Sequence, residues 1–283
     1  MEQIIDLGEV NSLKENKILF GENKKTTLVN SKIVFKGKNN ILFLEDDVNI
    51  KDSTLSFEGD NSVIYLSSNH NIYLLNVMVH SDSVFYMGEK NYMNGKLNAI
   101  CSERKHIVIG NRGLFSFGIW LRMADPHIIY DIESRKRKNL TKSIFLGDHI
   151  WVGQSAMILK GTKMGSGSIL GAMSLISNKT IPSNTIWGGN PAKQITSDIF
   201  FTNDVVHRYS PEQTEQSMTN GDDIFIYKKD ESTLSFDEID KALTDAKNAN
   251  ERLDYILKNI RGYKEKNRFF VGEMKSKKKR FVK

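Results

Sequence analysis

The stretch LGDHIWVGQSAMILKGTKMGSGSIL, from Leu146 to Leu170, places an aliphatic residue at every sixth position. Glycine occurs in it too often for a helix, and a helical period of 3.6 residues would scatter the aliphatic positions around the axis. A side chain that must point inward at every sixth residue is typical of a three-sided solenoid built from short strands. The spacing continues beyond the stretch, and its members are Leu146, Val152, Ile158, Met164, Leu170, Ile176 and Pro182.

Three such faces give a coil of about eighteen residues, which is the separation of Gly147 and Gly165. A glycine directly after an inward residue would permit a tight corner between two faces. An ordinary β-sandwich with glycine-rich turns is the alternative, but the long run of equal spacings favours the solenoid. We therefore predict a mainly β, parallel solenoid with three sides.

A weaker form of the repeat extends toward the N-terminus. The segments FKGKNNILFLEDDVNI and FEGDNSVIYLSSNHNI begin 22 residues apart, which predicts longer coils with polar corners. Positions that follow successive strands recur at intervals of 22, 21, 22 and 37 residues, and these are Glu45, Ser67, Gly88, Gly110 and Gly147. The last interval predicts an insertion of about fifteen to nineteen residues, at about 123–143, and insertions in solenoids often carry the function.

The C-terminal region has a different composition. We expect an N-terminal cap at 1–31, the solenoid at 32–196, and a C-terminal extension at 197–283. In the extension, Asp222 to Asp230 is compatible with one strand, and Ser235 to Ile260 predicts a helix whose N-terminus has a Ser235–Glu238 capping box. Its apolar stripe is expected to pack on the solenoid or cap an open end, and comprises Ile239, Leu243, Ala246, Leu253, Ile256, Leu257 and Ile260.

Composition narrows the class of protein. The 283 residues carry a net charge of +6, much of it in the stretch from Met274 to Lys283. That basic tail is expected to be solvated, with peripheral contact to a membrane or a polyanion as the alternative. Cys101 is the only cysteine, so an intrachain disulfide is excluded and a reducing compartment fits. The N-terminus lacks the apolar core of a signal peptide, and no apolar run approaches the ~20 residues of a membrane span. We predict a cytoplasmic protein that binds no nucleic acid.

Three motifs together resemble one family. The hexapeptide repeats, GDHIWVG and GGNPAK are similar to the hexapeptide-repeat, left-handed β-helix acyltransferases. The segment WLRMADPHIIYDIESRKRKN, followed by SIFLGDHIWVG, resembles O-acetyltransferases of bacterial surface polysaccharides, namely capsule, O-antigen and exopolysaccharide. The resemblance covers roughly residues 32–195. It implies a left-handed coil, acetyl-coenzyme A as the acetyl donor, no metal, and a homotrimer whose sites lie between neighbouring subunits and accept a sugar or polysaccharide.

The chemistry requires a base that removes the proton of the attacking sugar hydroxyl, and histidine suits this because its pKa lies near neutrality. Of the six histidines, only His127 lies in the insertion, where it matches the catalytic histidine in the Asp-x-His pattern of the family. Asp125 either orients that ring or serves as a turn carboxylate before Pro126, and both interpretations stay open. Relatives often have serine at the place of Ala124 and glycine at that of Pro126, so the loop geometry is expected to differ.

Trp151 directly precedes an inward residue and should therefore point outward, where an exposed indole needs a cover. The resemblance implies that a neighbouring active-site loop and the coenzyme arm supply the cover, and trimer packing alone is the alternative. Small residues that let the pantetheine approach the backbone, and lysines that match phosphate contacts, complete the expected coenzyme site: Gly153, Gly171, Ala172, Lys179, Pro191 and Lys193. Either lysine could instead be simply solvated.

Trp120 also precedes an inward residue and is a candidate for a subunit interface or a wall of the acceptor site. Arg122 and Arg137 are candidate acceptor-binding residues. Arg137 belongs to a basic run at 135–138, which is either a solvated loop or a site for an anionic acceptor.

Other functions have to be distinguished from the O-acetylation of a polysaccharide. An N-acetyltransferase of a nucleotide-linked amino sugar commonly has an N-terminal nucleotide-binding domain, and the first thirty residues are too short for one and lack a G-x-G-x-x-G motif. A serine acetyltransferase would have a helical domain before the repeats, and none is expected here. A zinc enzyme on this fold would need a close histidine pair, and the histidines of this sequence are too widely spaced for one. A glycan-binding solenoid with a decayed site is the non-enzymatic alternative.

Overall fold

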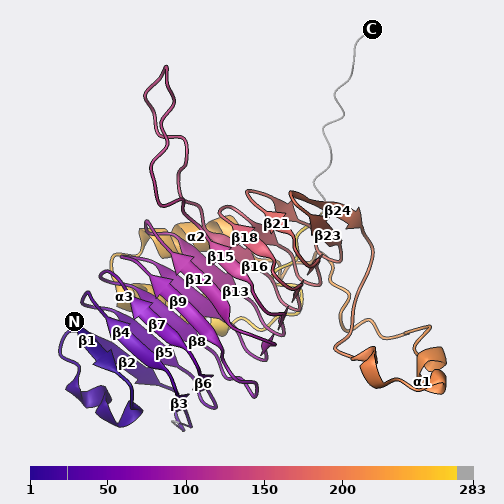
Figure 1. Ribbon diagram of the computed structural model, residues 1–283, viewed down its shortest axis with the longest axis horizontal. Coiled ribbons are helices and arrows are strands. Elements are labelled where there is room, and N and C mark those ends of the chain that lie inside the picture. The colour runs from indigo at the N-terminus through magenta and orange to yellow at the C-terminus, as the bar shows by residue number, and fades with distance from the viewer. Residues whose placement is uncertain (24, 273–283) are drawn as a thin grey trace.

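Three sheets wind around one elongated core in the computed structural model, which describes residues 1–23 and 25–272 (Figure 1). Their strands are parallel except for the antiparallel terminal strands Glu2–Ile4 and Ala192–Thr196. The predicted mainly β solenoid is confirmed. The chain passes from face 1 to face 2 to face 3 and back to face 1 in every regular coil. The basic stretch from Met274 to Lys283 lies outside the described residues.

Each face is defined by its strands. Face 1 contains β1 (Glu2–Ile4), β4 (Lys32–Phe35), β7 (Thr54–Phe57), β9 (Leu75–Val79), β12 (Leu97–Cys101), β15 (Trp120–Arg122), β18 (Met157–Leu159) and β21 (Leu175–Ile176). Face 2 contains β2 (Lys17–Phe20), β5 (Ile41–Leu44), β8 (Val63–Leu66), β10 (Val84–Met87), β13 (His106–Ile109), β16 (Ile144–Leu146), β19 (Lys163–Met164) and β22 (Thr180–Ile181). Face 3 contains β11 (Tyr92–Met93), β14 (Leu114–Phe115), β17 (Trp151–Val152), β20 (Ile169–Leu170), β23 (Ile186–Gly189) and β24 (Ala192–Thr196), and a separate pair, β3 (Thr27–Val29) and β6 (Asn49–Lys51), follows face 2 in the first coils.

The six-residue spacing marks the core, as predicted. Leu146, Val152 and Ile158 are each 0% exposed, and the later members up to Ile176 lie in the same buried cluster. The last member is an exception. Met164 pairs with Ile181 across 17 residues, so Ile181 and not Pro182 continues the inward row. Proline has no N–H for the ladder between coils, and the spacing ends there.

Contrary to the prediction, the glycines after the inward positions are not needed to turn a tight corner. Gly147 and Gly153 do not have a positive φ; instead, an added Cβ would lie 2.6 Å from the Ser166 nitrogen and 2.4 Å from the Ala172 nitrogen, respectively. They are therefore required because successive coils approach closely. The residues that turn the corners with positive φ are mostly not glycine, and they include Asn61, Asp82, Lys90, Arg112 and His149.

The parallel sheets begin earlier than the predicted boundary at residue 32. Strand β2 pairs in parallel with β5, and β3 pairs in parallel with β6. The first coil is irregular in length and spacing, so the repeat is hard to see in the sequence. The 3₁₀ helix η1 (Leu7–Ser12) packs against the core at this end through Leu7 and Val10.

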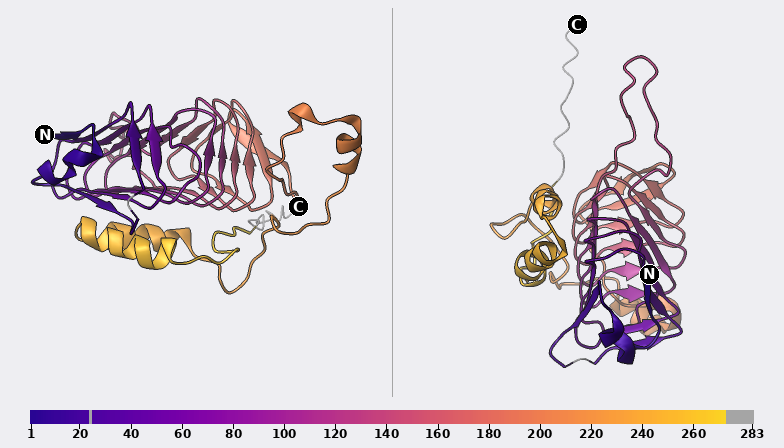
Figure 2. Two further views of the ribbon diagram at one scale, coloured as in Figure 1. Left: turned by 90° about the horizontal axis from the view of Figure 1, so that it is seen from below. Right: turned by 90° about the vertical axis from the view of Figure 1, so that its left-hand side faces the viewer.

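The C-terminal extension covers face 2 (Figure 2). The predicted single helix is two: α2 (Phe236–Asp245) and α3 (Ala249–Tyr255), continued by a π-helical turn η3 (Ile256–Arg261). The break occurs because Ala246 is extended and the Asn248 side chain accepts a hydrogen bond from the Glu251 N–H, which starts a new helix. Ser235 caps α2 by accepting a hydrogen bond from the Glu238 N–H, which is one half of the expected capping box; the reciprocal bond to the Glu238 side chain does not occur among the described residues. The helices bury the outward apolar side chains of face 2: Ile41, Val63, Tyr65, Val84, Tyr86, Val108 and Phe145.

Two buried arginines fix this extension to the solenoid. Arg252 is 0% exposed and its guanidinium donates to the Asn61 carbonyl and the Asp82 carboxylate at 3.2 Å each. Arg268 is 2% exposed and forms two parallel bonds of 2.8 Å to the Asp148 carboxylate. Bidentate pairs of this kind set both distance and orientation.

Between the solenoid and α2, residues 197–234 leave the body and return (Figure 1). This excursion contains the 3₁₀ helix η2 (Val206–Arg208) and α1 (Pro211–Gln216). The strand proposed at Asp222–Asp230 does not form, because Ile224 and Ile226 make turn hydrogen bonds and Tyr227 bonds to the Asn184 side chain instead of to a strand. Within the described residues, no helix has the length and apolar character to cross a bilayer.

Candidate active site

The insertion forms a projecting arm, residues 123–143, at the corner between β15 on face 1 and β16 on face 2 (Figure 1). Its two sides pair through the bridge between Tyr130 and Arg137 and through the bond from the Lys138 N–H to the Ile129 carbonyl at 2.8 Å. Apolar side chains on the arm face solvent: Ile128 is 54% exposed and Ile132 is 83% exposed. The arm is therefore a hydrogen-bonded projection with an apolar surface that its own chain does not cover.

His127 lies near the base of this arm with an exposed ring. Its carbonyl accepts a hydrogen bond of 2.7 Å from the side chain of Asn139, which is 7% exposed. The same amide donates to Asp125 at 3.1 Å, and its oxygen accepts from the Ile129 N–H at 2.9 Å. Asn139 thus holds both ends of the arm base together. This role could not be predicted from the sequence, because the pairing depends on how the arm folds back.

Asp125 has a partner other than His127. The Lys160 ammonium, in the turn after β18, forms an ion pair and hydrogen bond with the Asp125 carboxylate. This hydrogen bond lowers the pKa of Asp125 below its ordinary value. Among the contacts of the described residues there is none between the Asp125 carboxylate and the His127 ring, so in the isolated chain Asp125 fixes the arm rather than the ring.

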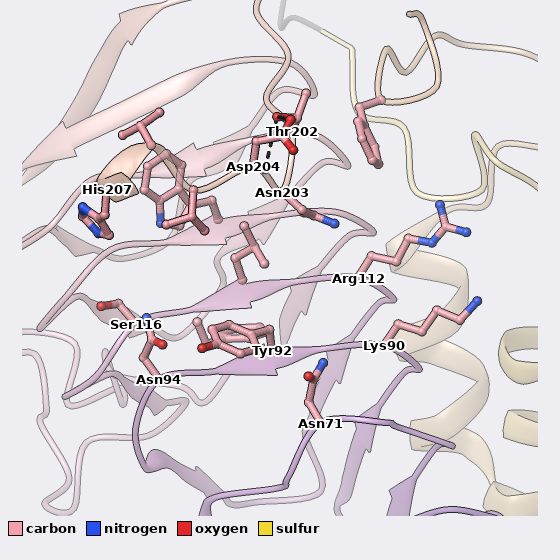
Figure 3. A pocket seen from close by; sticks show the side chains of 16 residues that line it. Asn71, Lys90, Tyr92, Asn94, Arg112, Ser116, Thr202, Asn203, Asp204 and His207 are labelled. Carbon is pink, nitrogen blue, oxygen red and sulfur yellow. Dashed lines mark hydrogen bonds between the residues drawn. The ribbon is translucent and has the colours of Figure 1, made fainter. Parts of the chain in front are cut away.

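Trp151 lies on face 3 and is 45% exposed, as its position before an inward residue predicts. A pocket of about 960 Å³ opens beside it (Figure 3). Its floor is formed by face 3 and the adjoining corners, with Tyr92, Leu114 and Trp151 among the lining residues. Its other wall is formed by Phe225 and by residues 202–207, which belong to a strap of the C-terminal extension at 201–207. The sequence did not predict this pocket.

The strap is attached to the solenoid through His149. Its ring is stacked between Phe201 and Phe225, with centroid distances of 4.0 and 3.9 Å and interplanar angles of 12°. The Nε2 atom donates to the Phe201 carbonyl at 2.9 Å, since a carbonyl can only accept. Burial lowers the pKa of His149, which favours the neutral ring that suits an aromatic stack. Because His149 lies two residues before Trp151, this stack places the strap directly beside the indole.

The expected coenzyme residues divide between two corners. Gly153, Gly171, Ala172, Pro191 and Lys193 all follow face-3 strands or lie in the β23–β24 hairpin, C-terminal to Trp151. Lys179 lies instead between β21 and β22, at the corner that carries the arm. The N–H groups of Gly153 and Gly171 donate to the Leu170 and Trp187 carbonyls at 2.8 Å, so they are used between coils and cannot also bind a ligand.

The side chains around this corner are nevertheless accessible. Ala172 and Lys193 are exposed, Met173 is 69% exposed and Ile195 is 68% exposed. An apolar strip that ends near a lysine has the chemistry to hold a long apolar arm with an anionic end.

The candidate acceptor residues are separated in the same way. Trp120 and Arg122 lie on β15 of face 1, partly exposed. Arg137 forms a bidentate pair with Glu103 at 2.7 and 2.9 Å, and Lys138 pairs with Asp131 at 2.8 Å. Half of the basic run at 135–138 is therefore already neutralised within the chain. In the described part of the chain, no group of three or more His, Cys, Asp or Glu side chains could hold a metal ion.

One chain does not bring His127 and Trp151 together. The arm lies at the corner between faces 1 and 2, while Trp151 lies on face 3. Going around the coil, face 1 separates them on one side, and face 2 with its helices separates them on the other. An arrangement that uses both residues in one site needs a second copy of the chain.

Similar proteins share one kind of activity in their names. The chain is 31% identical over 147 residues to a polysialic acid O-acetyltransferase of Neisseria meningitidis, covering 52% of this chain and 56% of that protein. It is 34% identical over 102 residues to a polysialic acid O-acetyltransferase of Escherichia coli O1:K1, covering 36% of this chain and 33% of that protein. The chain thus aligns with little more than half the length of these relatives at most.

A solved structure of an acetyltransferase also resembles the fold of this chain. The crystal structure of the polySia-specific acetyltransferase NeuO superimposes with a TM-score of 0.62 at 28% identity, over 71% of this chain and 93% of that chain. No protein-family model matches the chain.

Proposed function

The chain belongs to the hexapeptide-repeat, left-handed β-helix acyltransferases, and from this premise we propose that it is an acetyl-coenzyme A-dependent O-acetyltransferase of a bacterial surface polysaccharide or its precursor. The activity named for its relatives supports the reaction type. The observation that carries the proposal is the presence of two complementary, exposed elements on one solenoid: a histidine on a projecting arm, and a tryptophan beside a pocket on another face.

Two copies of the chain supply each site in this proposal. The exposed apolar surface of the arm, with Ile128, Ile129, Tyr130 and Ile132 all at least 54% exposed, supports a contact with a neighbour. Face 2 is covered by the C-terminal helices, which leaves faces 1 and 3 and the corners between faces for such contacts. A contact between unlike surfaces closes into a ring when the rotation allows it, and a homotrimer is the ring implied by the family.

His127 is the general base of the proposed reaction. Its ring nitrogen removes the proton of a sugar hydroxyl while the hydroxyl oxygen attacks the acetyl carbonyl carbon. The same proton is then returned to the sulfur that leaves, so the ring ends in its starting state. Because the chain's own Asp125 is bound to Lys160, its contribution is to hold the arm in place. Any partner that orients the ring must come from the neighbouring copy or the substrate.

The acetyl donor would lie along the corner C-terminal to Trp151. The exposed Ala172, Met173 and Ile195 side chains would contact its apolar arm, and Lys193 would meet a phosphate. Lys179 would serve the same donor only if it came from the neighbouring copy, since it lies on the arm corner. The thioester of the donor supplies the activated acetyl group. We further propose that the protein works in the cytoplasm, where acetyl-coenzyme A is made.

The test of the function is acetyl transfer to purified surface polysaccharides by wild type and His127→Ala. Loss of a general base lowers kcat by about 10²–10⁴-fold, while coenzyme affinity and subunit mass should not change. His70→Ala is the matched control, since His70 is also exposed and lies outside the arm. The proposal is contradicted if the wild type acetylates none of the glycans, or if His127→Ala keeps most of the wild-type kcat.

A further inference from the structure

The pocket beside Trp151 contains two cationic side chains from successive coils, Lys90 and Arg112 (Figure 3). Met87 pairs with Ile109, so the residues three positions further along are equivalent corner residues. Their φ angles, 60° and 59°, are nearly the same. Neighbouring strands of a sheet are about 4.8 Å apart, and Figure 3 shows both side chains extending to the same side. The pocket therefore has a pair of parallel cations at one edge.

No carboxylate balances this pair among the described residues. Neither Lys90 nor Arg112 takes part in an ion pair there, although both are exposed and lie on a chain with many acidic residues. The acidic residue that lines the pocket is Asp204, and its carboxylate accepts a hydrogen bond of 2.6 Å from the Thr202 hydroxyl on the strap. Two like charges at this separation repel each other, and an anion between them would remove that cost.

The rest of the pocket has the chemistry of a sugar site. Tyr92, 47% exposed, and Trp151, 45% exposed, present aromatic surface, and the amides of Asn71 and Asn94 can both donate and accept hydrogen bonds. The strap lines the same pocket on the side of Trp151, and the His149 stack holds it there. A pocket that combines aromatic surface, amides and a pair of cations is suited to a sugar ring with a carboxylate.

The position of the pocket also separates it from the donor. From Trp151 it extends over earlier coils, toward Arg112, Lys90 and Asn71. The exposed residues assigned to the acetyl donor, including Ala172 and Lys193, lie in later coils. Two substrates that approach from opposite ends of face 3 would meet at the indole.

We propose that this pocket is an acceptor subsite for a carboxylated glycan chain. Lys90 and Arg112 bind a carboxylate of the chain, Tyr92 contacts a sugar ring, and the strap at 201–207 closes over it. The C-terminal extension is thereby part of the acceptor site and not only a cover for face 2. The inference rests on the proposed function for the order of the two substrates, but the binding itself does not require turnover.

The experiment is calorimetric binding of a short sialic acid oligomer at low salt, without acetyl-coenzyme A. The reference ligand is the same oligomer with its carboxyl groups reduced to alcohols. The variant is Lys90→Gln with Arg112→Gln. Its matched control is Lys241→Gln with Lys247→Gln, which removes the same charge from exposed positions on α2 and in the link between α2 and α3.

We expect the Kd of the carboxylated oligomer to rise about tenfold or more in the pocket variant, as for lost charge-assisted hydrogen bonds. The control variant should bind the carboxylated oligomer with the Kd of the wild type. The reduced oligomer should bind wild type and pocket variant with similar Kd values. The inference is overturned if wild type does not prefer the carboxylated oligomer, if both variants lose equal affinity, or if the pocket variant loses coenzyme A binding instead. A wild-type protein that binds the oligomer through these cations but transfers no acetyl group to any glycan would refute the proposed function and leave the subsite intact.

Discussion

Replacement of Arg268 by methionine tests how the C-terminal extension is held. The guanidinium is 2% exposed, makes two 2.8 Å bonds to Asp148, and donates to the carbonyls of Ile260 and Tyr263 at 2.7 Å each. Methionine fills a similar volume but leaves a carboxylate that is 8% exposed and two carbonyls without these donors. Removing one partner of a buried pair costs about 3–5 kcal/mol.

The assay is guanidinium chloride unfolding followed by circular dichroism, with Arg104→Met as the control. Arg104 lies 3.9 Å from Asp82 with a side chain that is 62% exposed, and such surface pairs contribute about 0–1 kcal/mol. Adding Asp148→Asn to Arg268→Met should recover part of the loss, because the uncompensated charge is then gone. A loss below about 1 kcal/mol for Arg268→Met would show that the pair does not fix the extension.

Two further changes follow from the geometry. Gly153→Ala should destabilise the protein by about 1–3 kcal/mol, because its Cβ would lie 2.4 Å from the Ala172 nitrogen, whereas Gly171→Ala, with its nearest atom at 3.4 Å, should be almost neutral; equal melting temperatures for both variants would contradict this. The pair of Asp125 with Lys160 lowers the pKa of Asp125, so its contribution is complete above the ordinary pKa of aspartate and is lost as pH falls through the lowered value. In Lys160→Met the pKa of Asp125, measured by NMR, should rise toward its ordinary value, and an unchanged pKa would exclude Lys160 as the cause.

The core of the fold could be predicted because a solenoid is local. Each coil packs on the next, so the inward residues repeat in the sequence, and the register of Glu45, Ser67, Gly88, Gly110 and Gly147 is reproduced by the strand pairing. The insertion is visible for the same reason, since it interrupts the repeat. The predicted role of the glycines as corner residues was wrong. They are required because the next coil leaves no room for a Cβ, and not because of their own φ.

The parts that escaped prediction depend on contacts between distant segments. His149 is stacked by Phe201 and Phe225, more than fifty positions later, and no periodic pattern links them. The pair of Arg137 with Glu103 is similar, because each residue alone has the composition of a solvated loop. The cover of face 2 by helices had one usable signal in the sequence. The runs Val63–Leu66 and Val84–Met87 are apolar at every residue, which is typical of strands covered on both sides, and the structure buries them throughout.

The central claim is that each active site combines the arm of one copy with the face-3 tryptophan of another. Mixing His127→Ala and Trp151→Ala chains, each inactive alone, tests this directly by acetyl transfer after random reassembly. A seam between an intact arm and an intact indole occurs in about a quarter of the sites of an equal mixture, so about a quarter of the wild-type rate should return. A mixture as inactive as its two components would show that both residues act within one chain, or not at all.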